Sequence, residues 1–203
     1  MATQSVLSRD DLVWAIDRIR DELKARGVIG TIKIIGGTAM ILSDLADRES
    51  TVDIDAVVMT PADTITQISA DIARERAWPG DWINLQAQGL YPAYAGHPLW
   101  VESLPLSDET LSIQLATQEA LLAMKLNASR RGRDEGDIQA LMTACDVTTV
   151  AAADEHFSEY FRGESMPDKA VVLLRKLGYP DGDTAMYAHI PKSRPLHARS
   201  DID

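Results

Sequence analysis

Cysteine is nearly absent from the chain, because Cys145 is the only one among its 203 residues. One cysteine cannot form an internal disulfide, so the disulfide-stapled folds of small secreted proteins are excluded. Cys145 ends an apolar helical pattern that begins at Ile138, which favours a place in the core over a role as a nucleophile. Redox chemistry is therefore not expected.

Long apolar runs are missing as well. No stretch approaches the roughly 20 apolar residues that a membrane-spanning helix needs. The first residues also lack the charged and then apolar plan of a signal peptide. We therefore expect a cytoplasmic protein without a membrane partner.

Basic residues are in the minority: 20 Lys and Arg stand against 31 Asp and Glu, for a net charge of -11. This balance argues against non-specific affinity for nucleic acid. A local cluster of Lys125, Arg130, Arg131 and Arg133 can still bind phosphates, although cations at a helix C-terminus are a simpler explanation. With 45% hydrophobic residues, the chain can bury one core, and we expect one domain with a helical extension.

The most informative residues are two glycines, Gly36 and Gly37, and two aspartates, Asp53 and Asp55. An apolar strand that runs through Gly-Gly into a helix presents backbone N–H groups that suit phosphate. On a following strand, Asp53 and Asp55 project to the same side while Ile54 points to the core. Two neighbouring carboxylates repel each other, which a divalent cation such as Mg²⁺ relieves.

Simpler explanations exist for both motifs. Gly-Gly can be a plain turn, and Asp-x-Asp can be a solvated strand end. The surrounding segment, 52–59, is otherwise apolar enough for a buried strand, so its carboxylates need partners. Arg48 can neutralise one of them, and a metal ion can neutralise both.

The hydrophobic pattern predicts alternating strands and helices, followed by helices alone. The first helix begins at Ser8, with an acidic first turn, and ends before Gly27. A Thr60-Pro61 pair is expected to supply the N-cap and first position of a later helix. The expected strands are 31–35 and 52–59, with a hairpin of 99–104 and 111–115. The other expected helices are 38–45, 61–74, 118–130, 134–145, 150–161 and 168–177, and 82–88 is a short amphipathic piece.

The glycine and aspartate motifs resemble the core signature of the nucleotidyltransferase fold, with the closest match to its AbiEii-type branch. The residues that carry this resemblance are Gly36, Gly37, Thr38, Ala39, Arg48, Thr51, Asp53 and Asp55. A second block, 119–138, resembles the later motif of that branch through Lys125, Arg130, Arg133-Asp134 and Asp137-Ile138. The chain departs from the pattern in having Thr38 where Ser is common, Arg133 where Lys is common, and no evident third acidic strand motif.

The resemblance implies an α/β (α+β) nucleotidyltransferase fold with a small mixed sheet and a C-terminal helical subdomain. We expect a nucleotidyltransferase core in 1–116, a helical subdomain that completes the site in 117–190, and a flexible tail in 191–203. The tail contains His197. His97 and His156 are isolated, which favours structural roles over zinc binding.

The implied activity is Mg²⁺-dependent transfer of a nucleoside monophosphate from an NTP, such as ATP, to a tRNA 3′ end or a protein. The family also implies a toxin with a cognate antitoxin as its protein partner. Asp53 and Asp55 would hold the metal. Gly36, Gly37, Thr38, Arg48 and Lys125 would bind the nucleotide, and Asp134 or Asp137 would orient the acceptor or take its proton.

Alternatives remain open at this stage. Glu102 can be a third metal ligand, although an exposed hairpin position explains it better. Without a third acid, the chain can also be a non-catalytic nucleotide-binding module. An aspartyl phosphatase is disfavoured, because Val57 stands where a hydroxyl side chain is usual.

Overall fold

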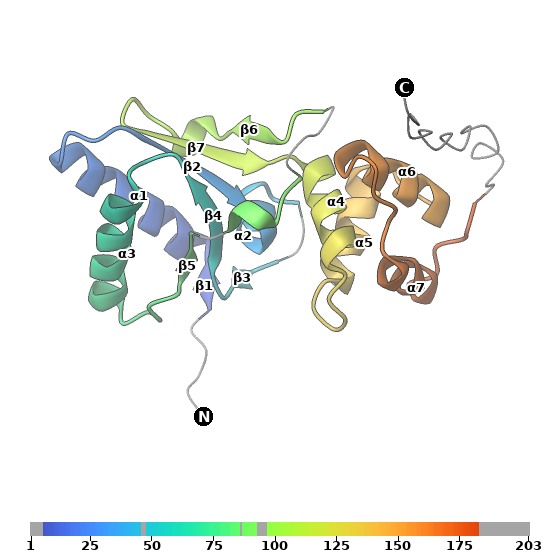
Figure 1. Ribbon diagram of the computed structural model, residues 1–203. Coiled ribbons are helices and arrows are strands. Elements are labelled where there is room, and N and C mark those ends of the chain that lie inside the picture. The colour runs from blue at the N-terminus through green and yellow to red at the C-terminus, as the bar shows by residue number, and fades with distance from the viewer. Residues whose placement is uncertain (1–5, 46–47, 86, 93–96, 183–203) are drawn as a thin grey trace, which may run out of the picture.

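In the computed structural model of the chain (Figure 1), the described residues are 6–45, 48–85, 87–92 and 97–182. The expected tail, 191–203, and His197 lie outside them. The helices are α1 (Arg9–Ala25), α2 (Gly36–Leu42), α3 (Ala62–Arg76), α4 (Gln118–Ala128), α5 (Glu135–Ala144), α6 (Val150–Tyr160) and α7 (Asp168–Lys176), with short 3₁₀ turns η1 (Ala87–Gly89) and η2 (Leu104–Leu106). None of the helices in the described part of the chain combines the length and the apolar character that crossing a membrane requires.

A mixed five-stranded sheet in the order β5-β4-β2-β7-β6 forms the centre of the N-terminal part. Its strands are β2 (Gly30–Ile35), β4 (Ile54–Val58), β5 (Ile83–Asn84), β6 (Trp100–Glu102) and β7 (Leu111–Ala116). β2 pairs antiparallel with β4 and parallel with β7, and β6 and β7 form the expected antiparallel pair. A separate two-stranded ribbon joins β1 (Leu7–Ser8) to β3 (Ser50–Thr51). The α/β class with a small mixed sheet is thus confirmed.

Local sequence explains where the helices begin. Ser8 caps α1 in a capping box, since its hydroxyl accepts from the backbone N–H of Asp11 while the Asp11 side chain accepts from the N–H of Ser8. Thr117 and Thr149 cap α4 and α6 in the same manner, each accepting from the N–H three residues later. All four C-terminal helices begin within one residue of their expected positions, including α5 and α7, which have no side-chain cap.

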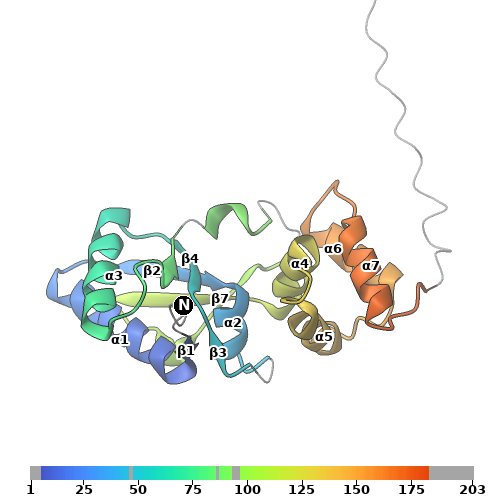
Figure 2. The same ribbon diagram turned by 90° about the horizontal axis from the view of Figure 1, so that it is seen from below.

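Helices α4 to α7 gather at one end of the sheet, as Figures 1 and 2 show from two directions. α4 follows β7 directly and contacts α5, α6 and α7, so it is the central helix of this group. α4 also contacts α2, which starts at the Gly-Gly turn. This contact brings the two sequence motifs to the same part of the molecule.

Two local expectations were wrong. Pro61, and not Thr60, occupies the N-cap of α3, because Pro61 still has an extended backbone and the helix starts at Ala62. The segment at 82–88 begins as the short strand β5, which pairs in parallel with β4, and continues into η1. Apolar patterns of this length do not separate a strand from a helical turn.

Candidate functional site

The turn between β2 and α2 lies against the aspartate strand. Gly36, the first residue of α2, has a positive φ of 66°, a conformation that favours glycine. A Cβ on Gly36 would also lie 3.1 Å from Oδ2 of Asp55. Glycine is therefore needed here both for the turn itself and for the close approach of Asp55.

Gly37 was expected to bind the nucleotide, and in the structure its neighbour is Arg48. A Cβ at this position would lie 2.9 Å from Cζ of Arg48, so the missing side chain makes room for the Arg48 guanidinium. Arg48 donates to the carbonyl oxygen of Ser50 at 3.1 Å and to Oδ2 of Asp137 at 2.7 Å. The Arg48 side chain thus pairs with the second motif and not with the neighbouring aspartates.

Asp55 is the second residue of β4, with Ile35 opposite it on one side and Asn84 on the other. The side-chain amide of Asn84 donates to Oδ1 of Asp55 at 2.8 Å. Ile54 is buried, as the alternation of a strand predicts, while Asp53 and Asp55 remain partly exposed. Asn84 therefore fixes the orientation of one of the two proposed metal ligands.

Asp53 comes just before β4 and is held through its backbone. Its carbonyl oxygen accepts hydrogen bonds from the hydroxyls of Thr38, at 2.9 Å, and Thr51, at 3.2 Å. The Thr38 side chain is buried, and its hydroxyl ties α2 to the Asp53 segment. The role that the structure gives to Thr38 is the positioning of Asp53.

The two carboxylates oppose each other's ionisation. Burial and the neighbouring charge of Asp55 raise the pKa of Asp53, and the positive charges of Arg133 and Arg130 only partly offset this. Two carboxylates and the carboxamide of Asn84 are hard oxygen donors, the kind that Mg²⁺ takes, with water or phosphate completing its shell. Within the described residues, no group of three His, Cys, Asp or Glu side chains could hold a metal ion.

Glu102 cannot supply a third ligand to this pair. It lies on β6, at the opposite edge of the sheet from β5, and Ser112 donates to its carboxylate at 3.0 Å. Its side chain is exposed, in agreement with the hairpin position favoured from the sequence.

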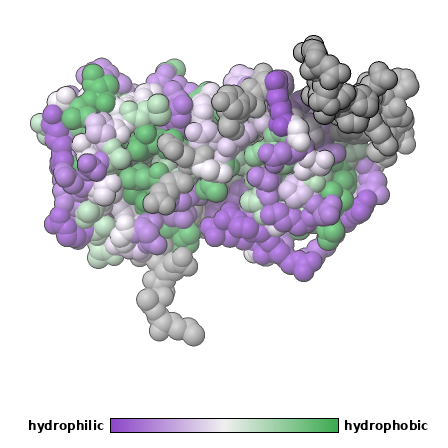
Figure 3. Space-filling view, in the orientation of Figure 1, coloured by the Kyte–Doolittle hydropathy of each residue, from purple (hydrophilic) through white to green (hydrophobic). Residues whose placement is uncertain are grey.

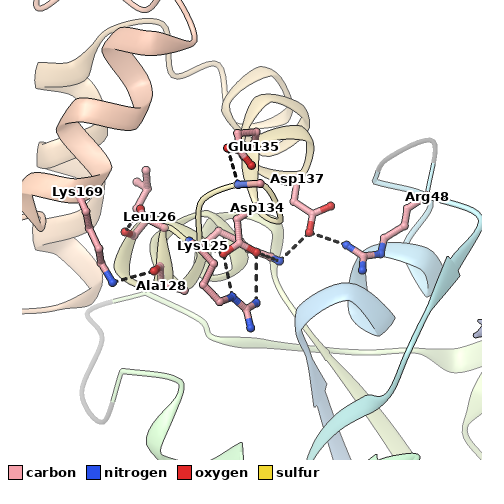
Figure 4. A network of polar contacts seen from close by, with 11 residues as sticks. Arg48, Lys125, Leu126, Ala128, Asp134, Glu135, Asp137 and Lys169 are labelled. Atoms are coloured by element: carbon pink, nitrogen blue, oxygen red, sulfur yellow. Dashed lines mark hydrogen bonds and ion pairs between the residues drawn. The ribbon is translucent and has the colours of Figure 1, made fainter. Parts of the chain in front are cut away.

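The second motif forms a buried ion-pair network between α4 and α5 (Figure 4). Nζ of Lys125 lies 2.9 Å from Asp134 and 2.7 Å from Asp137. Arg130 pairs with Asp134 through a 3.0 Å contact and also donates its backbone N–H to the same carboxylate. With Arg48, three cations share two carboxylates, which leaves one excess positive charge beside the aspartate strand.

Asp134 is fully buried and ionised. Burial alone would raise its pKa, but hydrogen bonds from Arg130 and Lys125 outweigh that cost and lower the pKa to about 2. A carboxylate with no exposed surface and such a low pKa is a poor proton acceptor. The network therefore favours a positioning role for Asp134 over the catalytic one that the sequence leaves open.

A cavity of about 250 Å³ joins the two motifs. It is lined by Ile35, Gly36 and Asp55 from the sheet side, Gly89 and Leu90 from η1 and the residue after it, and Leu121, Met124, Lys125, Asn127, Ala128 and Arg130 from α4 and the turn that follows. On the face drawn in Figure 3, hydrophilic side chains form a band over the α4–α5 turn that carries Arg130, Arg131 and Arg133. Gly36, Asp55 and Lys125, predicted from separate motifs, thus line one cavity.

No protein-family model matches the chain, and no curated protein matches it at a significant level. A search of solved structures finds similarity to the crystal structure of an antigenic nucleotidyltransferase-like protein from Paracoccidioides brasiliensis. The two chains are 15% identical, with a TM-score of 0.48 over 90% of this chain and 99% of the other. The narrower AbiEii assignment stays a prediction.

Asn84 is the site residue that sequence reasoning missed. Its only signal is a polar residue directly after the apolar pair Trp82-Ile83, which is too short to identify as a strand.

The two histidines of the described residues contact neighbouring helices. Nε2 of His156 lies 2.8 Å from the carbonyl oxygen of Glu119, and Nε2 of His97 lies 3.5 Å from the carboxylate of Glu159.

Cys145 at the end of α5 should be dispensable for any transfer activity. Burial and the charge of Glu119 raise the pKa of its thiol to about 12, so the nucleophilic thiolate is absent at neutral pH. We expect Cys145→Ser to keep transfer within about twofold of wild type and to lower the free energy of unfolding by about 1 kcal/mol. Rate assays and thermal unfolding test this, and a large loss of transfer with an unchanged melting temperature would contradict it.

Proposed function

We propose that this chain is a Mg²⁺-dependent nucleotidyltransferase that moves a nucleoside monophosphate from an NTP to a macromolecular acceptor. The observation that supports this most directly is the cavity in which Asp55, Lys125 and Arg130 meet. A carboxylate pair that gains from a divalent cation lies beside two cations that suit phosphate. That combination fits a metal-bound triphosphate.

Each residue would have a distinct part in binding. Asp53 and Asp55 would hold Mg²⁺, with Asn84 keeping Asp55 oriented, and the bound ion would offset phosphate charge. Lys125 and Arg130 would face the triphosphate from α4 and the turn after it. Arg48 and Asp137 would keep these cations in place by joining the sheet to α5.

The transfer step is a substitution at the α-phosphorus of the NTP. A hydroxyl oxygen of the acceptor forms a bond to this phosphorus, and the bond to the oxygen that bridges to the β-phosphate breaks. The electron pair of the broken bond leaves with pyrophosphate, and the hydroxyl proton passes to solvent water. The chain's own contribution is to hold the triphosphate in line with the acceptor and to neutralise its charge.

The finer parts of the proposal come from the sequence resemblance. An AbiEii-type toxin would transfer to a tRNA 3′ end or a protein and would be held in check by a cognate antitoxin in the cytoplasm. The basic residues of the α4–α5 turn, beside the cavity, are compatible with either acceptor. The main alternative is a non-catalytic module that binds NTP without turnover.

The test is incubation of the full chain with each labelled NTP, Mg²⁺ and either total RNA or total cell protein. We expect label in one of the two pools, and its loss when EDTA removes the metal. Label in neither pool, together with metal-dependent NTP binding, would favour the non-catalytic module. The absence of metal-dependent NTP binding would contradict both.

A further inference from the structure

Two chemically different sets of residues line the cavity. Asp55, Lys125 and Arg130, the groups assigned above to metal and phosphate, define what we call its charged end. The apolar side chains of Leu90 and Met124 define what we call its apolar end. A polar group, Asn127, also lines the cavity and has no role in the phosphate site.

We infer that the apolar end is the subsite for the nucleobase, and that Asn127 is the residue that selects the base. This inference rests on the proposed function, since it assumes that the ligand is a nucleotide. Beyond the proposed function, the inference names the residue by which the site would distinguish one NTP from another.

Helix geometry places Asn127 away from Lys125. At 100° per residue, Met124 and Ala128 lie near the centre of the face of α4 that lines the cavity, and Leu121 lies between them and Lys125. Lys125 lies on one flank of this face, directed to Asp134 and Asp137 on α5. Asn127 lies on the opposite flank, about 160° around the helix from Lys125 and three residues after Met124. One helix therefore separates a phosphate-facing cation from a carboxamide beside an apolar side chain.

The size of the cavity agrees with this division. At about 250 Å³ it lies just below the usual range of small-molecule pockets, roughly 300–1,000 Å³. It is therefore suited to part of a nucleotide and not to a whole NTP. The triphosphate, which is strongly hydrated, would extend past the charged end, and the flat faces of the base would pack against the apolar end.

Leu90 and Asn127 both lack the partners that such side chains usually have. Leu90 is 50% exposed at the edge of the cavity, and a bound base would cover part of that apolar surface. No described residue forms a hydrogen bond with the Asn127 carboxamide. A carboxamide offers a donor and an acceptor side by side, the arrangement that reads the edge of a base.

The experiment measures the affinity of ATP, GTP, CTP and UTP with Mg²⁺, and of inorganic triphosphate as a probe of the charged end alone. The full chain is compared with Asn127→Leu, Asn127→Asp and a matched control, Gln139→Leu, which changes an exposed position on α5. Wild type should prefer one NTP by about tenfold or more. Asn127→Leu should reduce that preference to about threefold or less, and Asn127→Asp, which lacks the donor, should change the order of the four NTPs.

Triphosphate affinity should stay within about twofold of wild type in Asn127→Leu and in the control, since neither changes the charge of the cavity. Asn127→Asp adds a negative charge that weakens triphosphate binding, so this variant is judged by the order of the four NTPs alone. The control should behave as wild type throughout. An unchanged order and range of affinities in both Asn127 variants would overturn the inference, even if transfer is observed. Base-selective binding that depends on Asn127, but without transfer to any acceptor, would instead support the subsite and contradict the transferase. If no NTP binds, both are wrong.

Discussion

Replacing Asp55 by alanine is expected to abolish nucleotide transfer while leaving the fold intact, and Asp53→Ala should do the same. Each change removes one of two carboxylates proposed to hold Mg²⁺. The loss of several kcal/mol of charge stabilisation in the transition state corresponds to a rate that is lower by about 1,000-fold or more. Single-turnover transfer with saturating NTP is the measurement.

Thermal unfolding provides a second readout for Asp53. Burial and the charge of Asp55 raise the pKa of Asp53 in the folded state. Ionisation of Asp53 therefore lowers the free energy of unfolding as the pH rises from the pKa of the unfolded chain through the pKa of the folded protein. Above that range Asp53→Ala should be at least as stable as wild type without metal. Mg²⁺ should raise the melting temperature of wild type and have little effect on the variant.

Asp81 provides the matched control for both measurements. Its exposed carboxylate contributes to the raised pKa of Asp53 but is not assigned to the metal site. Asp81→Ala should therefore retain transfer and the response to Mg²⁺. Full activity of Asp53→Ala and Asp55→Ala would disprove the metal site, and equal losses in the Asp81 variant would show that only the total negative charge matters.

Replacing Lys125 by alanine is expected to destabilise the protein severely. The ammonium group is buried between Asp134 and Asp137, and removal of one member of a buried ion-pair network typically costs about 3–5 kcal/mol. Loss of transfer in Lys125→Ala would then report unfolding as well as lost phosphate binding. Two measurements separate these effects. Denaturant unfolding gives the loss of stability, and NTP binding is assayed at a low temperature at which the variant is still folded.

Acid unfolding tests the same network in the wild-type chain. The pKa of Asp134 is depressed to about 2, so its contribution is present above pH 4 and should disappear as the pH falls from about 4 to 2. Lys125→Ala should shift that loss to higher pH. Lys169→Ala, which removes one exposed bond to the carbonyl oxygen of Ala128, is the control and should unfold as wild type does. A Lys125→Ala variant as stable as this control would contradict the network.

Much of the fold could be predicted from the sequence because its signals are local. Ser8, Thr117 and Thr149 mark helix starts through hydrogen bonds that span three residues. The hairpin of β6 and β7 and the Gly-Gly turn follow from patterns within a short stretch. Gly36 shows the limit of such reasoning: its position in a turn was predictable, whereas its contact with Asp55 requires knowledge of how β2 and β4 pair.

The features that could not be predicted join distant segments. The pairs Arg48–Asp137 and Asn84–Asp55 are 89 and 29 residues apart in the sequence. Arg48 illustrates this: Asp53 and Asp55 are its nearest acidic candidates in the motif, yet α5 brings Asp137 within 2.7 Å of its guanidinium. Pairings of this kind depend on the packing of whole elements.

The position of β7 within the sheet has a consequence for how the chain folds during synthesis. β7 pairs with β2 along almost its whole length, from Gly30 opposite Leu111 to Ile34 opposite Leu115. A nascent chain that has released β2 and β4 from the ribosome therefore still has an open, apolar β2 edge until residues 59–116 are made. Such an edge can pair with strands of other chains. The interval before β7 emerges is thus when the growing polypeptide is most exposed to aggregation and most in need of a chaperone.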